Sequence, residues 1–159
     1  QTRLTTEYLL LAVPAHFPEN EELAPYRLTY SDIIAGKHET ATGNVPLQKL
    51  QNVPFILMNR DNDTRKATEK IFQACDFSPK MLFELDRLTT LYSYVELGAA
   101  TSIVSDTLVR NVHTADPGHI YFYPINSKYA CRGIYVSYKK NKYHSPAMQV
   151  FASSIAQLK

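Results

Sequence analysis

Several kinds of residue are scarce in this sequence, and each scarcity excludes a class of protein. The 159 residues include no tryptophan, five glycines and two cysteines. So little glycine, without a fixed repeat, excludes collagen-like and other low-complexity chains. Apolar residues make up 45% and charged residues 20%, which excludes intrinsic disorder. The longest apolar runs, Tyr8–Pro14 and Val53–Met58, are far shorter than the roughly 18 residues of a membrane-spanning helix. We therefore expect a soluble globular chain.

Charge and cysteine content limit the kinds of function that we expect for this chain. Seventeen Lys and Arg stand against fifteen Asp and Glu, a formal net charge of +2. A duplex-binding module usually has a stronger basic bias, so we do not expect this chain alone to hold DNA. Cys75 and Cys131 lie outside any metal-ligand spacing and are either two reduced, packed thiols or a redox-sensing pair. No signal peptide is visible, so we expect a cytoplasmic protein.

Strand and helix patterns alternate along most of the chain. Tyr8–Val13 is apolar on both sides, which predicts a strand covered on both faces, as in the middle of a parallel sheet. The other predicted strands are Val53–Met58, Met81–Leu85, Thr101–Val104, Ile120–Ile125 and Gly133–Tyr138. The predicted helices are Ser31–Ala35, Thr64–Cys75, Leu88–Val95, Asp106–Asn111 and a last one after Ser145. This order predicts an α/β fold with a mostly parallel sheet.

The end of the chain carries two further patterns. Ser145 is the expected N-cap of the last helix, with Pro146 at its first position. Its apolar stripe, expected to be buried, is formed by Met148, Phe151, Ala152 and Ile155. Just before it, Tyr135–His144 interleaves basic and aromatic residues, as single-strand binders do. We favour the simpler interpretation, a strand that leaves the sheet through a solvated, lysine-rich loop.

The turn after the strand Val53–Met58 is the best candidate for a ligand site. In open α/β sheets, ligands bind beyond the carboxyl ends of strands, near helix N-termini with free N–H groups. The amide, hydroxyl and guanidinium groups there can bind a small carboxylate or other anion, while its aspartates either cap the helix or meet an ammonium group. A second such turn follows Leu85. The candidate ligand-binding residues are Asn59, Arg60, Asp63, Thr64, Arg65 and Asp86.

Motifs for metal binding and catalysis are missing. Alternating Asn59, Asp61 and Asp63 resemble a calcium loop, but Thr64 and Lys70 stand where that loop needs Gly and Glu. The sequence has no nucleophile elbow, P-loop, dinucleotide fingerprint or HExxH motif, and its five histidines are scattered. We therefore predict no catalytic residue, no metal ligand and no cofactor, and we do not expect an enzyme.

Four segments, in order, resemble the effector-binding part of LysR-type transcriptional regulators. They are Leu9–Pro18, Val53–Pro79, Leu91–Ser105, and Tyr123–Tyr138 together with the last helix. The resemblance runs from about Tyr8 to the end and implies a two-lobed fold like that of type 2 periplasmic binding proteins. It implies a small effector between the lobes, a homodimer or homotetramer, no membrane, and DNA bound through an N-terminal domain outside this chain. A solute-binding protein of a transporter, which uses the same fold, is the alternative.

The resemblance also implies a division of the chain. Residues 45–125 would form lobe two, and residues 1–44 and 126–159 would form part of lobe one with the hinge, its other part being absent. The two crossings would lie near Pro14–Phe17 and Asn126–Ala130. The loop that touches the effector maps to Asn59, Arg60 and the helix start at Thr64 and Arg65. The stretch Glu19–Pro46 is longer than the family usually shows, and its role stays open.

Overall fold

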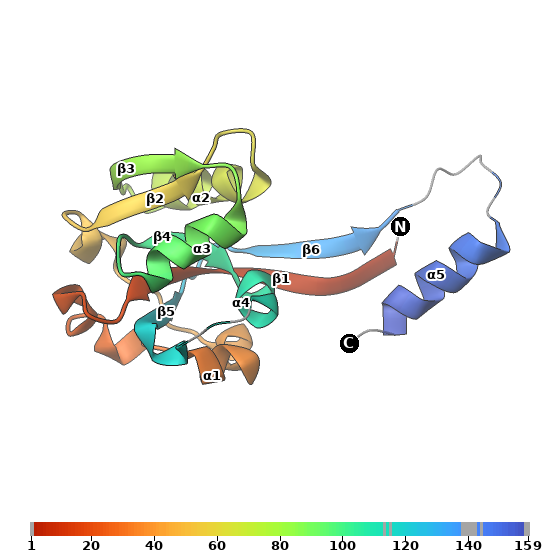
Figure 1. Ribbon diagram of the computed structural model, residues 1–159, viewed down its shortest axis with the longest axis horizontal. Helices are drawn as coiled ribbons and strands as arrows, with labels where there is room; N and C mark the ends of the chain where they lie inside the picture. The colour runs from red at the N-terminus through yellow and green to blue at the C-terminus, as the bar shows by residue number, and fades with distance from the viewer. Residues whose placement is uncertain (1, 113, 115, 138–142, 144, 158–159) are drawn as a thin grey trace.

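The computed structural model describes residues 2–112, 114, 116–137, 143 and 145–157, with only the backbone of residues 156 and 157. Figure 1 shows a body from which two paired strands extend toward a separate helix. The strands are β1 (Thr2–Pro14), β2 (Pro54–Met58), β3 (Lys80–Leu85), β4 (Ser102–Ser105), β5 (Ile120–Pro124) and β6 (Cys131–Val136). The helices are α1 (Tyr30–Ile34), α2 (Asp63–Ala74), α3 (Leu88–Glu96), α4 (Asp106–Asn111) and α5 (Pro146–Gln157), with 3-10 turns η1–η5 between them.

The sheet of the body has β1 at its centre. The second half of β1 pairs antiparallel with β4 on one side and with β5 on the other. β2 and β3 pair in parallel, and a parallel bridge from Phe55 to Thr101 joins β2 to the β4 side. Because β4 and β5 both run opposite to β1, every strand of this sheet except β1 points the same way. The α/β prediction is confirmed, with β1 as the one antiparallel member.

The apolar run of β1 explains its central place, because its side chains alternate between two cores. Leu9, Leu11 and Val13 face the layer formed by α2 and the turn Leu47–Leu50. Leu10 and Ala12 face the layer formed by α1, α3 and α4. All five are at most 2% exposed. A strand that is apolar on both sides is stable only where both faces are covered, as the sequence predicted.

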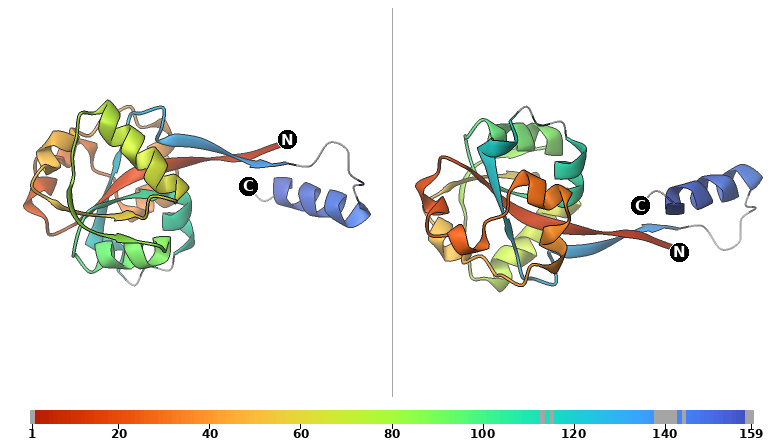
Figure 2. Two further views of the ribbon diagram at one scale, coloured as in Figure 1. Left: turned by 90° about the horizontal axis from the view of Figure 1, so that it is seen from above. Right: turned by 90° about the horizontal axis from the view of Figure 1, so that it is seen from below.

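The first half of β1 leaves the body. Residues Thr2–Tyr8 pair antiparallel with β6, and we call this two-stranded extension the arm. Figure 2 shows, from above and from below, that the arm projects from one end of the body and that α5 lies beyond it. The stripe of α5 is therefore not buried within the described chain: Met148 is 43% and Phe151 65% exposed. The stripe prediction is wrong here, although Ser145 does cap the helix by accepting from the Met148 N–H.

Two expectations about the division of the chain need correction. Leu9–Pro14 is the centre of the same sheet as β4 and β5, so this strand does not stand apart in another lobe. Pro14 pairs with Ile120 at the end of β1 far from the arm, so Pro14–Phe17 is not where the chain crosses. At Tyr8 the pairing of β1 changes from β6 to the body, which favours a crossing there. The boundaries at residues 44 and 125 stay a prediction, and these pairings favour a first boundary at Tyr8.

Other local predictions agree with the structure. The helices predicted at Thr64–Cys75 and Leu88–Val95 are α2 and α3. In the structure α2 begins after the cap residue Asn62, and α3 is followed by Gly98, whose φ of +79° favours glycine. The strand expected at Gly133–Tyr138 is β6, which ends at Val136. Tyr138 and most of the basic and aromatic stretch that follows lie outside the described residues.

Candidate functional site

The candidate site lies at the edge of the sheet from which the arm leaves. Since β2, β3, β4 and β5 point the same way, their carboxyl ends meet at this edge. Helices α2, α3 and α4 begin directly after β2, β3 and β4. Helix N-termini carry unpaired N–H groups and a partial positive charge, so this edge attracts polar or anionic ligands. The topology thus brings both candidate turns, after Met58 and after Leu85, to one place.

The N-terminus of α2 is already capped by the chain. The Asn62 side-chain oxygen accepts hydrogen bonds from the N–H groups of Thr64 (2.8 Å) and Arg65 (3.3 Å). The expectation that this helix offers free N–H groups is therefore wrong for these two positions. A ligand at the helix start has to share or displace the Asn62 cap. Without rearrangement, the helix contributes to anion binding only the partial positive charge of its N-terminus.

Arg65, one of the expected ligand residues, turns toward the sheet. Its side chain is 7% exposed, and Nη1 donates to the Met58 carbonyl (2.7 Å) and to the Glu84 carboxylate (2.8 Å). Nε donates to Glu69, one helical turn further along α2 (2.9 Å). These contacts tie α2 to the ends of β2 and β3. The geometry gives Arg65 a structural role at the edge.

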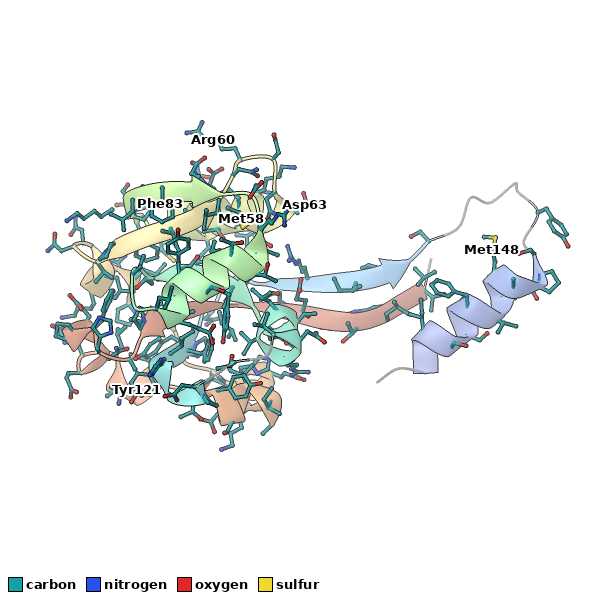
Figure 3. The ribbon with its side chains drawn as sticks, viewed as in Figure 1. Met58, Arg60, Asp63, Phe83, Tyr121 and Met148 are labelled. Carbon is teal, nitrogen blue, oxygen red and sulfur yellow. The ribbon has the colours of Figure 1, made fainter. Side chains whose placement is uncertain are left out.

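The remaining predicted residues surround the helix start at different depths. Figure 3 shows Arg60 pointing away from the body, whereas Asp63 lies on the side from which the arm leaves. The Asp63 carboxylate is 88% exposed and pairs with Lys66 at 3.2 Å. The Asn59 N–H donates to the Leu85 carbonyl (2.7 Å), which joins the two candidate turns. Asp86 follows in the second turn and is exposed. Thr64 alone among the six has its side-chain oxygen buried against the arm.

Arg132 and Glu7, which sequence reasoning missed, complete this site. Arg132 lies on β6, and its Nη2 donates to the Thr64 hydroxyl oxygen at 3.1 Å. Its Nε donates to the Glu7 carboxylate of β1, which is 9% exposed. A cation and an anion at matched positions of two strands are a signal of cross-strand pairing, but the sequence does not show which strands are neighbours. The guanidinium is 30% exposed and can still reach a ligand at the edge.

The opposite face of β1 carries a second polar cluster at the same edge. The Asp106 carboxylate, 4% exposed, accepts from His38 Nε2 (2.9 Å), the Tyr8 N–H (2.9 Å) and the Thr107 N–H (2.9 Å). Burial works to raise the pKa of Asp106, but the hydrogen bonds from His38 and Tyr8 and the charge of Arg110 outweigh it and lower this pKa. Asp106 is therefore ionised inside the protein.

Comparison with known proteins agrees with this architecture. Residues 2–158 match the family model described as the LysR substrate binding domain. The uncharacterized HTH-type transcriptional regulator YcgK of Bacillus subtilis (strain 168) is 27% identical over 150 residues, which is 94% of this chain and 44% of YcgK. The effector binding domain of QuiR in complex with shikimate superposes with a TM-score of 0.65 at 20% identity, over 98% of this chain and 62% of that one. The regulatory domain of Synechocystis PCC6803 CcmR in complex with 2-PG superposes with a TM-score of 0.71 at 17% identity. The match covers 98% of this chain and 64% of that one.

The fold, with one antiparallel strand in an otherwise parallel sheet and an arm at the edge where the other strands end, is that of a lobe of the periplasmic-binding-protein type. The chain belongs to the LysR substrate-binding domain family. This membership does not favour the alternative of a transporter's solute-binding protein. The chain spans less than half the length of YcgK. No helix in the described part of the chain is both long and apolar enough to cross a membrane.

Proposed function

We propose that this chain is the effector-binding part of a LysR-type transcriptional regulator. Its ligand is a small metabolite with a carboxylate or another small polar anion, bound between the strand-end edge of the body and the lobe that the arm joins. The observation that carries the proposal is the hydrogen bond from Arg132 to Thr64. It brings a cation on the arm to the start of α2, so one ligand can touch both parts. In QuiR the ligand is shikimate, which carries a carboxylate.

The charges at the edge support a mechanism in which the effector replaces Glu7 as the partner of Arg132. Arg132 is shared between Glu7 and Thr64. A ligand carboxylate that binds the guanidinium competes with Glu7, because both are anions that accept charge-assisted hydrogen bonds. The exchange changes how β6 is held against the body, and so it favours one orientation of the arm over another. An effector acts on a regulator by such a difference in affinity between two states.

The other properties of the whole protein follow from this proposal. A regulator with an HTH-type domain outside this chain binds DNA, works in the cytoplasm and is not an enzyme. We also propose that it forms a homodimer or homotetramer. The exposed edge strand β3 supports a subunit contact, since Met81, Leu82 and Phe83 are 37–49% exposed there. Unpaired strand edges with apolar side chains favour association.

The proposal is tested by calorimetric titration of the protein that contains this chain. Shikimate and a panel of other small carboxylates and phosphate esters are each compared with their uncharged methyl esters or amides. We expect at least one anion to bind and its neutral analogue to bind much more weakly. Arg132→Met, which removes the charge and keeps the length, should weaken binding at least about tenfold. Equal affinity for charged and neutral forms, or an unchanged Arg132→Met variant, would contradict the proposal.

A further inference from the structure

The long segment 19–46 places a buried histidine next to the root of the arm. Its 3-10 turn η3 (Lys37–Thr40) carries His38, whose side chain is 0% exposed. The Tyr8 ring packs edge-on against the His38 ring, with centroids 5.5 Å apart. The His38 Nε2 is 2.9 Å from the Asp106 carboxylate, so segment 19–46 and α4 are joined by a buried hydrogen bond between charged or chargeable groups.

The Asp106 carboxylate connects three parts of the chain. One oxygen, Oδ1, accepts from the Tyr8 and Thr107 N–H groups, and the other, Oδ2, accepts from His38. Arg110 Nη2 lies 3.8 Å from Oδ2 and pairs more closely with Glu39 of η3 at 2.8 Å. Breaking one bond in such a buried network leaves a costly unpaired polar group. The network therefore holds Tyr8, α4 and η3 in one arrangement.

Tyr8 is the residue at which β1 changes its partners. Tyr8 pairs with Cys131 in the arm, whereas the next residue, Leu9, pairs with Ser105 in the body. The Leu9 N–H donates to the Ala130 carbonyl (2.7 Å), at the second crossing of the chain. The bond from the Tyr8 N–H to Asp106 is thus made at the point where the arm leaves the body.

A cavity lies beside this point. It has a volume of about 160 Å³ and is lined by Tyr8–Leu10 of the first crossing, Pro124–Ser127 and Ala130–Cys131 of the second, and His38, Glu39 and Ala41 of the long segment. This space between both crossings, which is partly open to solvent, gives the root of the arm room to bend once the hydrogen bonds of Asp106 are broken.

We propose that His38 and Asp106 form a polar clamp that fixes the direction in which the arm leaves the body, and that carrying His38 is the role of segment 19–46. With the clamp closed, the root of the arm has one orientation. With the clamp open, the root bends toward the cavity and the arm takes a second orientation. This goes beyond the proposed function, because it requires no ligand and no DNA.

The test is hydrogen exchange of the whole protein without added ligand, measured by mass spectrometry on overlapping peptides. His38→Ala removes the donor to Asp106, and His38→Gln restores an N–H donor without an imidazole. His119→Ala is the matched control, since His119 is 61% exposed and pairs only with the exposed Asp116 in the described chain. Peptides from α2 report on general loss of stability. Circular dichroism melting establishes that each variant is folded.

We expect His38→Ala to speed exchange around Tyr8 about tenfold while α2 exchanges as in the wild type. His38→Gln should recover most of the protection, and His119→Ala should change nothing at Tyr8. The clamp is refuted if a folded His38→Ala protein exchanges normally at Tyr8. It is also refuted if β1 and α2 accelerate equally, or if Gln gives no recovery, since His38 would then only fill space. None of these outcomes depends on whether an anion binds at Arg132.

Discussion

Glu7 and Tyr8 are neighbours in β1, and each binds a different part of the chain. The Glu7 carboxylate accepts from Arg132, which also contacts Thr64 at the start of α2. The Tyr8 N–H donates to Asp106, which also contacts His38. The root of the arm is therefore held by two separate contacts at consecutive residues. A change in either contact is transmitted to the same piece of backbone.

Arg132 and Arg60 should differ in their effect on anion binding. Arg132 is held at the helix start, whereas Arg60 is exposed and points away from the body. We predict that Arg60→Ala weakens binding of an anionic effector less than about threefold, since an exposed charge acts through screened solvent, while Arg132→Met weakens it at least about tenfold. Calorimetry of both variants measures this order. The opposite order would place the ligand on the outer side of the turn.

Arg65→Met should destabilise the protein more than it affects any ligand. The substitution leaves the Met58 carbonyl without its buried donor and removes two ion pairs, both to partly exposed carboxylates. We expect the free energy of unfolding to fall by about 2–3 kcal/mol, measured by urea denaturation. Lys66→Met is the control on the same helix, because its 3.2 Å pair with Asp63 is exposed and contributes little. Comparable losses in both variants would contradict the structural role of Arg65.

Asp106 should make stability depend on pH in the acid range. Its pKa in the folded protein is lowered from the usual 3.8, so its ionised form stabilises the fold above pH 3.8. This contribution is lost as the pH falls through the lower, folded-state pKa. We predict that Asp106→Asn costs about 2 kcal/mol at pH 6 and that the difference from the wild type shrinks below pH 3.8.

Comparing the wild type with Asp106→Asn distinguishes the effect of Asp106 on stability from that of Asp32, another carboxyl group that titrates in acid. The hydrogen bonds from Lys37 and Thr29 lower the pKa of Asp32 to about 2. Both proteins contain these bonds, so the contribution of Asp32 to the pH dependence of stability cancels in the comparison. Urea denaturation from pH 6 to pH 2.5 gives the difference directly. A difference that stays constant, or that grows as the pH falls, would mean that Asp106 is not ionised in the fold.

In the proposed homodimer or homotetramer, the β3 edge is the proposed subunit contact. Leu82→Lys places a charge on this exposed edge, where Leu82 is 49% exposed. Because burying an unpaired ammonium is costly, we expect the dissociation constant of the dimer to rise at least about tenfold in sedimentation velocity. Leu97→Lys is the control, since Leu97 is 82% exposed and lies outside β3. An unchanged dimer in Leu82→Lys would remove β3 from the subunit contact.

Local sequence patterns predicted most helices and strands. The two-sided apolar run Tyr8–Val13 required a central strand, and Ser145 was predicted to cap the last helix, as the structure shows. These predictions succeed because capping and alternation act within a few residues of the chain. The turn after β2 was also placed between a strand end and a helix start, since the strand before it and the helix after it were recognised. Its role in binding a ligand stays a prediction.

Long-range contacts could not be predicted in the same way. Arg65 was expected to meet a ligand, but the Met58 carbonyl and Glu84 hold it against the sheet. Arg132 and Thr64 are 68 positions apart, as are His38 and Asp106. Nothing in either residue's neighbours along the chain specifies its partner, because the pairing depends on strand order and on the path of segment 19–46.

The sequence by itself determined an α/β chain with a buried central strand and a polar turn between a strand end and a helix start, because apolar alternation and helix caps are short-range properties. Only the tertiary structure decided that β1 belongs to both the body and the arm, that Arg132 of β6 contacts Thr64 at the start of α2 while Arg65 turns toward the sheet, and that His38 of the long segment pairs with Asp106. Those contacts form where distant strands are brought together, and burial then selects which polar groups must pair.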